Sequence, residues 1–227
     1  MSVAELSSEL LEQISAYTAG MKRNVSLIMN TGEHEERNNL KKFLHAVAGA
    51  SERLSIEERD AGNMLRSPIS FSLEVEGEDT GISFSGIPSG HEFNSLILAI
   101  LQSGGVPSKL DESNVAVIKS IDEELRFEVF VSLNCHNCPD IVQLINQFAL
   151  LNKNIQSEMI DGGLFQDIIA DRDITGVPCV YVNGKPFSQG RASSANLIEK
   201  LAGFSRNETE VKSGKNDAQD LVVIGAG

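Results

Sequence analysis

The chain has 227 residues, enough for one large domain or two small ones that each bury a core. Its 32 acidic and 19 basic residues give a net charge of −13, and such a chain repels phosphate backbones, so nucleic-acid binding is not expected. The N-terminus lacks the basic and apolar regions of a signal peptide, and no apolar run is long enough to span a bilayer. We therefore expect a globular, cytoplasmic protein.

The first half of the chain predicts a leading helix over residues 1–20, followed by alternating strands and helices. An alternating apolar stretch after Pro68 predicts a strand that turns back on itself, and a later apolar helix stops at Gly104 and Gly105. The expected strands are 25–29, 53–57, 69–75 and 82–84, and the expected helices are 40–47 and 93–101.

The second half repeats this order of elements after a short connecting helix. A strand leads into Cys135-His-Asn-Cys138, which introduces a helix with one apolar face, and the Asn183-Gly184 pair between two apolar runs predicts a hairpin. A last helix is expected to end at Gly203. The expected strands are 125–133, 155–160 and 179–182, and the expected helices are 141–151, 164–170 and 195–201.

The two halves align at an offset of about 105 residues, with Pro68 matching Pro178. This repeat predicts an α/β fold of two tandem β-α-β-β-β-α units. Only the second unit has cysteines at its first strand-to-helix turn, because the first has Thr31-Gly-Glu-His34 there. The expected domains are a leading helix (1–20), a redox-silent unit (21–108), a dithiol unit (109–204), a polar linker (205–219) and the first strand of a truncated Rossmann domain (220–227).

Residues 220–227 predict a buried parallel strand that runs into Gly225-Ala-Gly227, the first two glycines of a G-x-G-x-x-G motif. A dinucleotide site also needs the third glycine of that motif and the helix behind it. We therefore expect an incomplete dinucleotide-binding motif here, and no cofactor bound by this chain itself.

The chemistry is expected at Cys135 and Cys138, where a strand ends and a helix begins. The unpaired N–H groups and the positive dipole end of that helix favour the thiolate of Cys135 over its thiol. Cys135 is expected to be the exposed, attacking sulfur, and Cys138 the deeper sulfur that resolves the mixed disulfide. His136 and Asn137, between the two cysteines, are expected to contact the partner. The spacing therefore predicts reversible thiol–disulfide exchange.

Val177 and Pro178 form the second part of the expected site. We expect a cis peptide bond between them that faces the dithiol, keeps metal from it and leaves the Val177 backbone free to pair with a partner's extended segment. Zinc is the competing use of a Cys-x-x-Cys pair, but no second Cys/His pair with zinc spacing exists, so no metal site is expected. Cys179 is expected to be a buried, inert thiol.

A proton acceptor for the dithiol is harder to identify. Thioredoxins usually carry a buried acid six residues before the first cysteine, but Val129 stands at that position. The best candidate is Glu92, in Ser89-Gly-His-Glu-Phe93 at the start of the silent unit's last helix. From the residues alone, a solvated glutamate stabilised by the helix dipole is the better interpretation of Glu92.

The tandem units, the Cys135/Cys138 centre and the terminal strand together resemble the N-terminal region of the flavoprotein component of alkyl hydroperoxide reductase, a bacterial peroxiredoxin reductase. The resemblance implies two thioredoxin/glutaredoxin-like units packed as one double-thioredoxin domain. The segments that carry it are 90–93, Gly104-Gly105, 132–140, 160–163, 176–178 and 182–185.

The family implies a route for electrons. NADH reduces FAD in the C-terminal part of the full-length protein, the flavin reduces a dithiol there, and that dithiol reduces Cys135 and Cys138. These then reduce the disulfide of the peroxiredoxin component of alkyl hydroperoxide reductase. The polar linker would let this domain visit both partners in turn. The resemblance also favours Glu92 as the group that assists the dithiol.

Two other functions remain open. A stand-alone, glutaredoxin-like general protein disulfide oxidoreductase would use the same centre, but tandem proteins of that kind usually carry a dithiol in each unit, whereas residues 31–34 contain none. In a third interpretation, the dithiol is a zinc-binding or redox-sensing element of a binding module. A zinc assay would separate this last function from the other two.

Overall fold

The structure is a computed structural model that describes residues 6–213, without the side chains of residues 63 and 204–213. Its strands form a single eight-stranded mixed sheet in the order β2-β1-β3-β4-β6-β5-β7-β8. The strands are β1 (Val25–Met29), β2 (Leu54–Glu58), β3 (Ser70–Val75), β4 (Glu78–Ser85), β5 (Leu125–Val131), β6 (Ile155–Asp161), β7 (Cys179–Val182) and β8 (Lys185–Gln189). The helices are α1 (Ser8–Thr18), α2 (Arg37–Gly49), α3 (Phe93–Ser103), α4 (Glu112–Lys119), α5 (Cys138–Leu151), α6 (Gln166–Asp171) and α7 (Ser194–Ser213), with short 3-10 turns η1 (Gly62–Met64) and η2 (Gly90–Glu92).

Each half of the sheet has the same internal order, which confirms the tandem repeat. In the first half, β1 pairs parallel with β2 and antiparallel with β3, and β3 pairs with β4. In the second half, β5 pairs parallel with β6 and antiparallel with β7, and β7 pairs with β8. The two halves join through parallel pairing of β4 with β6. The boundaries expected at 21–108 and 109–204 stay a prediction.

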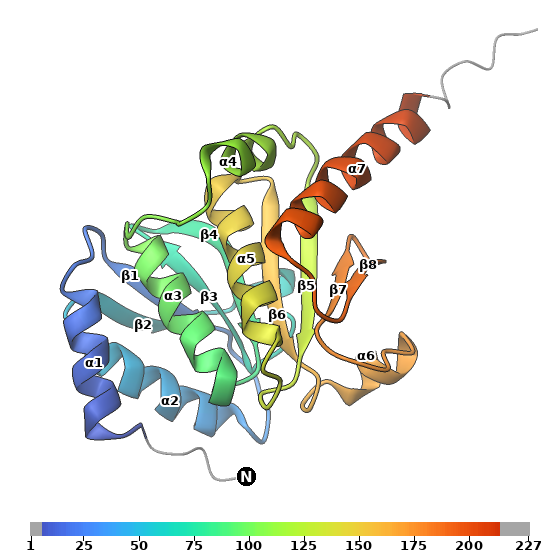
Figure 1. Cartoon of the computed structure of the whole chain (residues 1–227). Coiled ribbons are helices and arrows are strands. Elements are labelled where there is room, and N and C mark those ends of the chain that lie inside the picture. The colour runs from blue at the N-terminus through green and yellow to red at the C-terminus, as the bar shows by residue number, and fades with distance from the viewer. Residues whose placement is uncertain (1–5, 214–227) are drawn as a thin grey trace, which may run out of the picture.

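The helices α3 and α5 pack against each other over the middle of the sheet, where Figure 1 shows them side by side. The apolar spacing in α5 predicted one buried face, and this prediction is confirmed: Ile141, Leu144, Ile145 and Phe148 are all buried in the core. Since α3 comes from the first unit and α5 from the second, the two units share one hydrophobic core.

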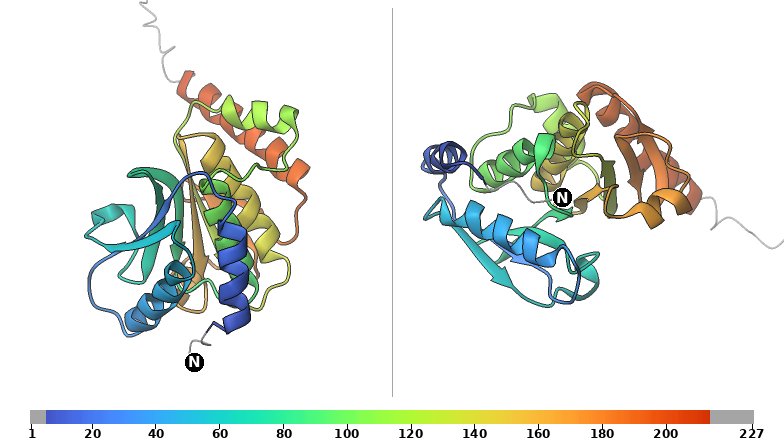
Figure 2. Two further views of the ribbon diagram at one scale, coloured as in Figure 1. Left: turned by 90° about the vertical axis from the view of Figure 1, so that its left-hand side faces the viewer. Right: turned by 90° about the horizontal axis from the view of Figure 1, so that it is seen from below.

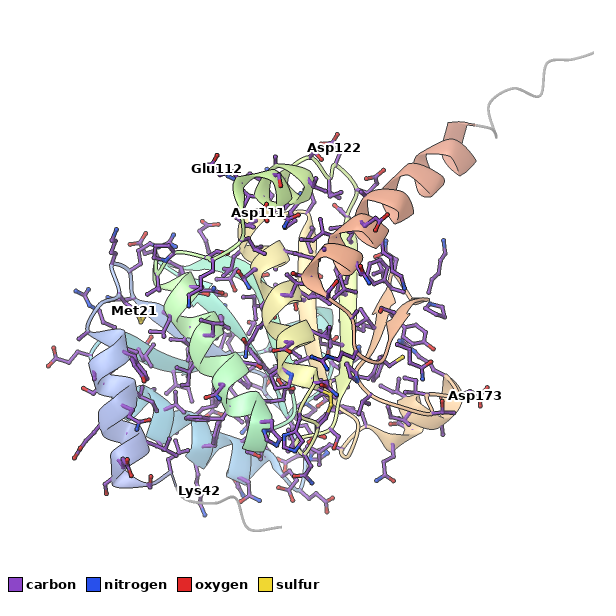
Figure 3. The ribbon with its side chains drawn as sticks, viewed as in Figure 1. Met21, Lys42, Asp111, Glu112, Asp122 and Asp173 are labelled. Carbon is purple, nitrogen blue, oxygen red and sulfur yellow. A yellow bond between two sulfur atoms is a disulfide. The ribbon has the colours of Figure 1, made fainter. Side chains whose placement is uncertain are left out.

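The turn between α1 and β1 closes against the end of α3. The backbone N–H groups of Lys22 and Arg23 both donate to the carbonyl oxygen of Gly104. A Cβ atom at Gly104 would lie 2.3 Å from the side chain of Met21, which is labelled in Figure 3. A side chain at Gly104 would therefore force the buried Met21 side chain to shift, so this glycine allows close packing as well as ending the helix.

The connecting helix α4 lies beside α7 and also contacts α5. Figure 2 shows α4 and α7 side by side at one end of the molecule. Asp111 caps α4 by accepting a hydrogen bond from the N–H of Asn114 at 2.8 Å. Within residues 6–213, no helix combines the length and the apolarity needed to cross a lipid bilayer.

The end of the last helix differs from the expectation. Instead of ending at Gly203, α7 continues to Ser213, so residues 205–213 of the expected linker are helical. Glycine within a helix costs about 1 kcal/mol relative to alanine but does not end it, and the glutamate and lysine residues that follow favour a helix. The rest of the expected linker and the strand with Gly225 and Gly227 lie outside the described residues.

Candidate redox site

The two cysteines of the expected centre form a disulfide bond in the loop between β5 and α5. Their Cα atoms lie 5.5 Å apart, and Cys138 is the first residue of α5. Cys138 is fully buried, whereas Cys135 is partly exposed. The prediction that Cys135 is the more accessible sulfur is therefore confirmed. Its role as the attacking sulfur stays a prediction.

The start of α5 provides the electrostatic setting. Within the described residues, the side chain of the N-cap residue Asn137 does not cap the helix by a hydrogen bond. Pro139 lies in the first turn, where a backbone N–H has no partner within the helix, so its missing N–H removes no helical hydrogen bond. The remaining free N–H groups of this turn, together with the helix dipole, carry partial positive charge. A thiolate at Cys135 would be stabilised by that charge.

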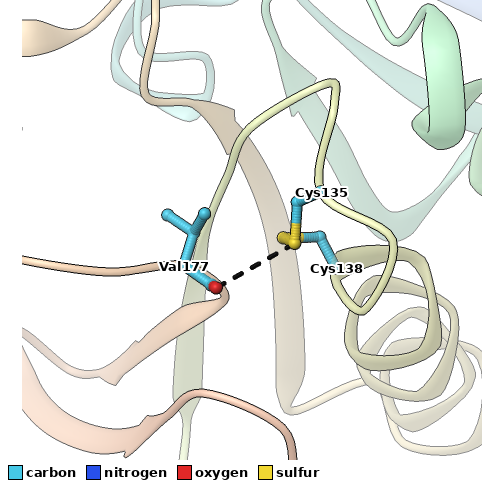
Figure 4. The surroundings of a disulfide bond; sticks show 3 residues. All are labelled: Cys135, Cys138 and Val177. Carbon is cyan, nitrogen blue, oxygen red and sulfur yellow. Dashed lines mark hydrogen bonds between the residues drawn. A yellow bond between two sulfur atoms is a disulfide. The ribbon is translucent and has the colours of Figure 1, made fainter.

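A cis peptide bond joins Val177 and Pro178, as expected. The Cys135 Sγ atom lies 3.9 Å from the carbonyl oxygen of Val177. Figure 4 shows the Val177 carbonyl oxygen facing the disulfide. The loop is held on its other side by the N–H of Gly190, which donates to the Pro178 carbonyl at 2.7 Å. The structure thus brings together Cys135, Cys138, Val177 and Pro178, although they come from two separate segments of the chain.

The redox-silent unit also reaches the site, through His91 on η2. The backbone N–H of His91 donates to the carbonyl oxygen of Leu133, which precedes the cysteines, at 3.1 Å. The ring of His91 lies against the ring of His136, with a centroid distance of 4.1 Å and an interplanar angle of 58°. Sequence reasoning did not single out His91, and its place beside Glu92 in the chain was the signal that could have identified it.

Glu92 is fully buried, so the interpretation of it as a solvated glutamate is wrong. The 3-10 turn η2 that carries it packs against α5, the helix that begins with Cys138. Neither carboxylate oxygen of Glu92 has a hydrogen bond in the described structure. Burial raises the pKa of Glu92 to about 7, and the nearby hydroxyl of Ser95 offsets part of this effect. A carboxyl group with this pKa can exchange a proton near neutral pH.

The strand that leads to the dithiol carries a second buried acid, which sequence reasoning missed. Val129 is buried and apolar, but its neighbour Glu128 forms ion pairs with Arg66 and Arg172 at 2.6 and 2.7 Å. Although burial alone would raise the pKa of Glu128, hydrogen bonds from Arg172 and Arg66 bring it below its usual range. Glu128 is therefore held as a carboxylate and is unsuited to accept a proton at the dithiol.

The remaining cysteine behaves as a core residue. Cys179 is buried on β7, and burial raises the pKa of its thiol, with a smaller opposing effect of Arg172. This confirms that Cys179 is a buried thiol. Among the described residues, no group of three or more His, Cys, Asp or Glu side chains is arranged to hold a metal ion.

Comparison with known proteins agrees with this geometry. A thioredoxin-domain family model matches residues 125–203. The F subunit of alkyl hydroperoxide reductase from Escherichia coli is 38% identical over 222 residues, which cover 98% of this chain and 42% of that protein. The chain thus spans about two fifths of the length of this curated relative.

Two solved structures from Enterococcus faecalis are similar over most of the chain. A C503A mutant of the F subunit of alkylhydroperoxide reductase (AhpF) has a TM-score of 0.80 and 30% identity, covering 86% of this chain and 99% of that chain. The NTD_N/C domain of AhpF also has a TM-score of 0.80, with 29% identity, covering 87% of this chain and 100% of that chain. The chain therefore belongs to the AhpF family of alkyl hydroperoxide reductase proteins and is a thiol–disulfide oxidoreductase domain that corresponds to the family's N-terminal domain.

Proposed function

We propose that this chain carries electrons from a dithiol of a flavoprotein to the disulfide of a peroxiredoxin. The observation that carries the proposal is a Cys135–Cys138 disulfide at a helix N-terminus, with one sulfur accessible, in a chain of this family. FAD and NADH would act in the rest of the full-length protein, and Gly225 and Gly227 of this chain would begin the FAD motif. The expected compartment is the cytoplasm, where reducing partners keep such dithiols turning over.

The reaction is a pair of thiol–disulfide exchanges. The Cys135 thiolate attacks one sulfur of the peroxiredoxin disulfide, which forms a mixed disulfide and releases the other peroxiredoxin sulfur as a thiolate. Cys138 then loses its proton and attacks Cys135, which closes the intramolecular disulfide and releases the second peroxiredoxin thiolate. Two electrons pass to the partner. The flavoprotein dithiol restores the reduced state by the same steps in reverse.

The surroundings of the disulfide suit these steps. Because the Val177 carbonyl lies next to Cys135, an extended segment of the partner could pair with this backbone while its disulfide meets the sulfur. His136 and Asn137 are exposed on the same loop and would contact the partner. Glu92 would accept the proton of Cys138, since the η2 turn that carries Glu92 packs against α5, which begins with Cys138, and burial raises the pKa of Glu92 to about 7.

Stopped-flow exchange between the reduced chain and the oxidised peroxiredoxin of the same organism tests the proposal. Fast exchange is expected, and Cys135→Ser should abolish it, while Cys138→Ser should trap a mixed disulfide between Cys135 and the peroxiredoxin. Insulin reduction serves as the comparison. Equal rates with insulin and peroxiredoxin would instead indicate a stand-alone general oxidoreductase, and no exchange with either would exclude the dithiol function.

A further inference from the structure

The segment Gly90–Glu92 of the redox-silent unit touches the dithiol loop at two adjacent points. One is the hydrogen bond from the His91 N–H to the Leu133 carbonyl, and the other is the ring contact between His91 and His136. The second contact concerns the dithiol directly, because His136 lies between Cys135 and Cys138 in the chain.

The position of His91 is fixed by its neighbours in the chain. Gly90 has a φ of +57°, and a Cβ atom there would lie 2.6 Å from the carbonyl oxygen of Leu133. On the other side, Glu92 is fully buried, and α3 begins at Phe93. With a close backbone contact before it and a buried side chain after it, the backbone of His91 cannot move away from the loop without disrupting the packing of η2.

The backbone of His136 is held by the disulfide of its flanking cysteines, but the His136 side chain has no such support. It is exposed, and an exposed side chain ordinarily samples several rotamers. The His91 ring lies in contact with the His136 ring, so it excludes the His136 rotamers that would overlap it. The placement of an imidazole next to a reactive cysteine matters because a nearby histidine stabilises the thiolate.

We propose that His91 is a positioning residue for thiol–disulfide exchange, which acts by holding the ring of His136 beside the two cysteines. The redox-silent unit then contributes to the centre by orienting a residue of the dithiol loop, in addition to sharing its core. The inference rests on the proposed function only in that Cys135 exchanges disulfides, and it does not depend on which protein is the partner.

The test compares His91→Ala, His91→Phe, His136→Ala and the double variant His91→Ala/His136→Ala. The probe is 5,5′-dithiobis(2-nitrobenzoate), a small disulfide, mixed with each reduced protein in a stopped-flow instrument. His91→Ala should lower the second-order rate constant by about three- to tenfold, the range that loss of an aromatic pair represents. His91→Phe, which keeps a ring against His136, should stay within about twofold of the unmodified chain by the same reasoning.

The decisive comparison is the double-mutant cycle. If His91 acts through His136, then His91→Ala should have no further effect on the rate once His136 is alanine. The same loss in both backgrounds, or no loss in His91→Ala alone, would overturn the proposal. His45→Ala, which removes an exposed histidine of α2, is the matched control, and thermal unfolding of each variant checks that the fold is intact.

Because the probe is a small disulfide and not the peroxiredoxin, the outcome of this test does not depend on the proposed partner. If the unmodified chain reacts with the small disulfide but not with the peroxiredoxin, the proposed partner is wrong, while the mutant cycle still decides the role of His91. If the peroxiredoxin reacts but the cycle shows no coupling, the proposed function stands and His91 has no positioning role.

Discussion

At the scale of single residues, Glu92 combines a carboxyl group, which is usually ionised near neutral pH, with complete burial, which disfavours the ionised form. A fully buried carboxyl group without a hydrogen bond favours its neutral form, and so its pKa of about 7 lies above that of a glutamate in the unfolded chain. Such a group reduces stability whenever it must ionise within the folded protein. A residue that is unfavourable for stability in this way is more readily explained by a part in proton transfer than by packing.

This property predicts how stability depends on pH. Below pH 4.5, Glu92 is protonated in both the folded and the unfolded chain, and it has no differential effect. Between pH 4.5 and about 7, only the unfolded chain ionises, so folding becomes less favourable as the pH rises, by about 3 kcal/mol in total. Glu92→Gln should remove this dependence, so urea unfolding at pH 5 and pH 8 should show a smaller loss of stability in the variant.

Glu112→Gln is the control for this change, because Glu112 is exposed in the first turn of α4. The same pH dependence in Glu92→Gln as in the unmodified chain would show that Glu92 is not the buried titrating group. Glu92→Gln should also slow exchange with the peroxiredoxin by about tenfold or more at pH 7, since an amide cannot accept the proton of Cys138.

At the scale of elements, the contact between η2 and the dithiol loop depends on one glycine. Gly90 has a positive φ, and its missing side chain leaves room for the Leu133 carbonyl. Gly77, in the turn between β3 and β4, also has a positive φ, but a Cβ atom there would meet nothing within 4 Å. An alanine in place of Gly77 would therefore meet only backbone strain, whereas an alanine in place of Gly90 would meet both backbone strain and a steric clash.

Both Gly90→Ala and Gly77→Ala should destabilise the protein, by about 1 kcal/mol for the left-handed backbone alone. Gly90→Ala should cost about 1–3 kcal/mol more than Gly77→Ala, because the added Cβ atom also displaces the backbone of Leu133. Thermal or urea unfolding of both variants measures this difference. Equal losses of stability would contradict the close approach of η2 to the dithiol loop.

The order of the elements could be predicted from the sequence, because the spacing of apolar residues reflects which faces are buried. The redox centre could also be predicted from the sequence, since Cys135 and Cys138 are close in the chain and their chemistry depends on the start of the helix beside them. The burial of Glu92 and the contact of His91 with His136 could not be found this way. Both arise where two units meet, and the pattern within one segment does not report what packs against it.

The extent of the last helix was not predictable for a different reason. Gly203 in a polar stretch is a common end of a helix, and local propensity on either side of it differs by only a few tenths of a kcal/mol per residue. With so small a difference, the choice between helix and linker for residues 205–213 is not decided by the local sequence.

At the scale of the whole molecule, an ion-pair network joins the two units on strands near the centre of the sheet. Arg66 comes from the first unit, between β2 and β3, and it bonds to Glu128 on β5 and Glu158 on β6 at 2.6 and 2.7 Å. Glu158 also accepts a hydrogen bond from Ser85 on β4 at 2.6 Å. Both carboxylates are buried, and Arg66 pairs with both of them, while Arg172 also pairs with Glu128 and Arg126 with Glu158.

Removing Arg66 would leave both carboxylates buried with fewer partners, although Arg172 and Arg126 would still reach them. Arg66→Ala should therefore destabilise the protein by about 3–5 kcal/mol at pH 7, as for a broken buried ion pair.

Because Arg66 and Arg172 lower the pKa of Glu128, the stability that this carboxylate contributes is present at neutral pH and is lost as the pH falls. The difference between Arg66→Ala and the unmodified chain should thus be smaller at pH 4 than at pH 7. Arg53→Ala is the control, because Arg53 is exposed. If Arg66→Ala lowers the free energy of unfolding equally at both pH values, packing rather than charge accounts for the effect of Arg66.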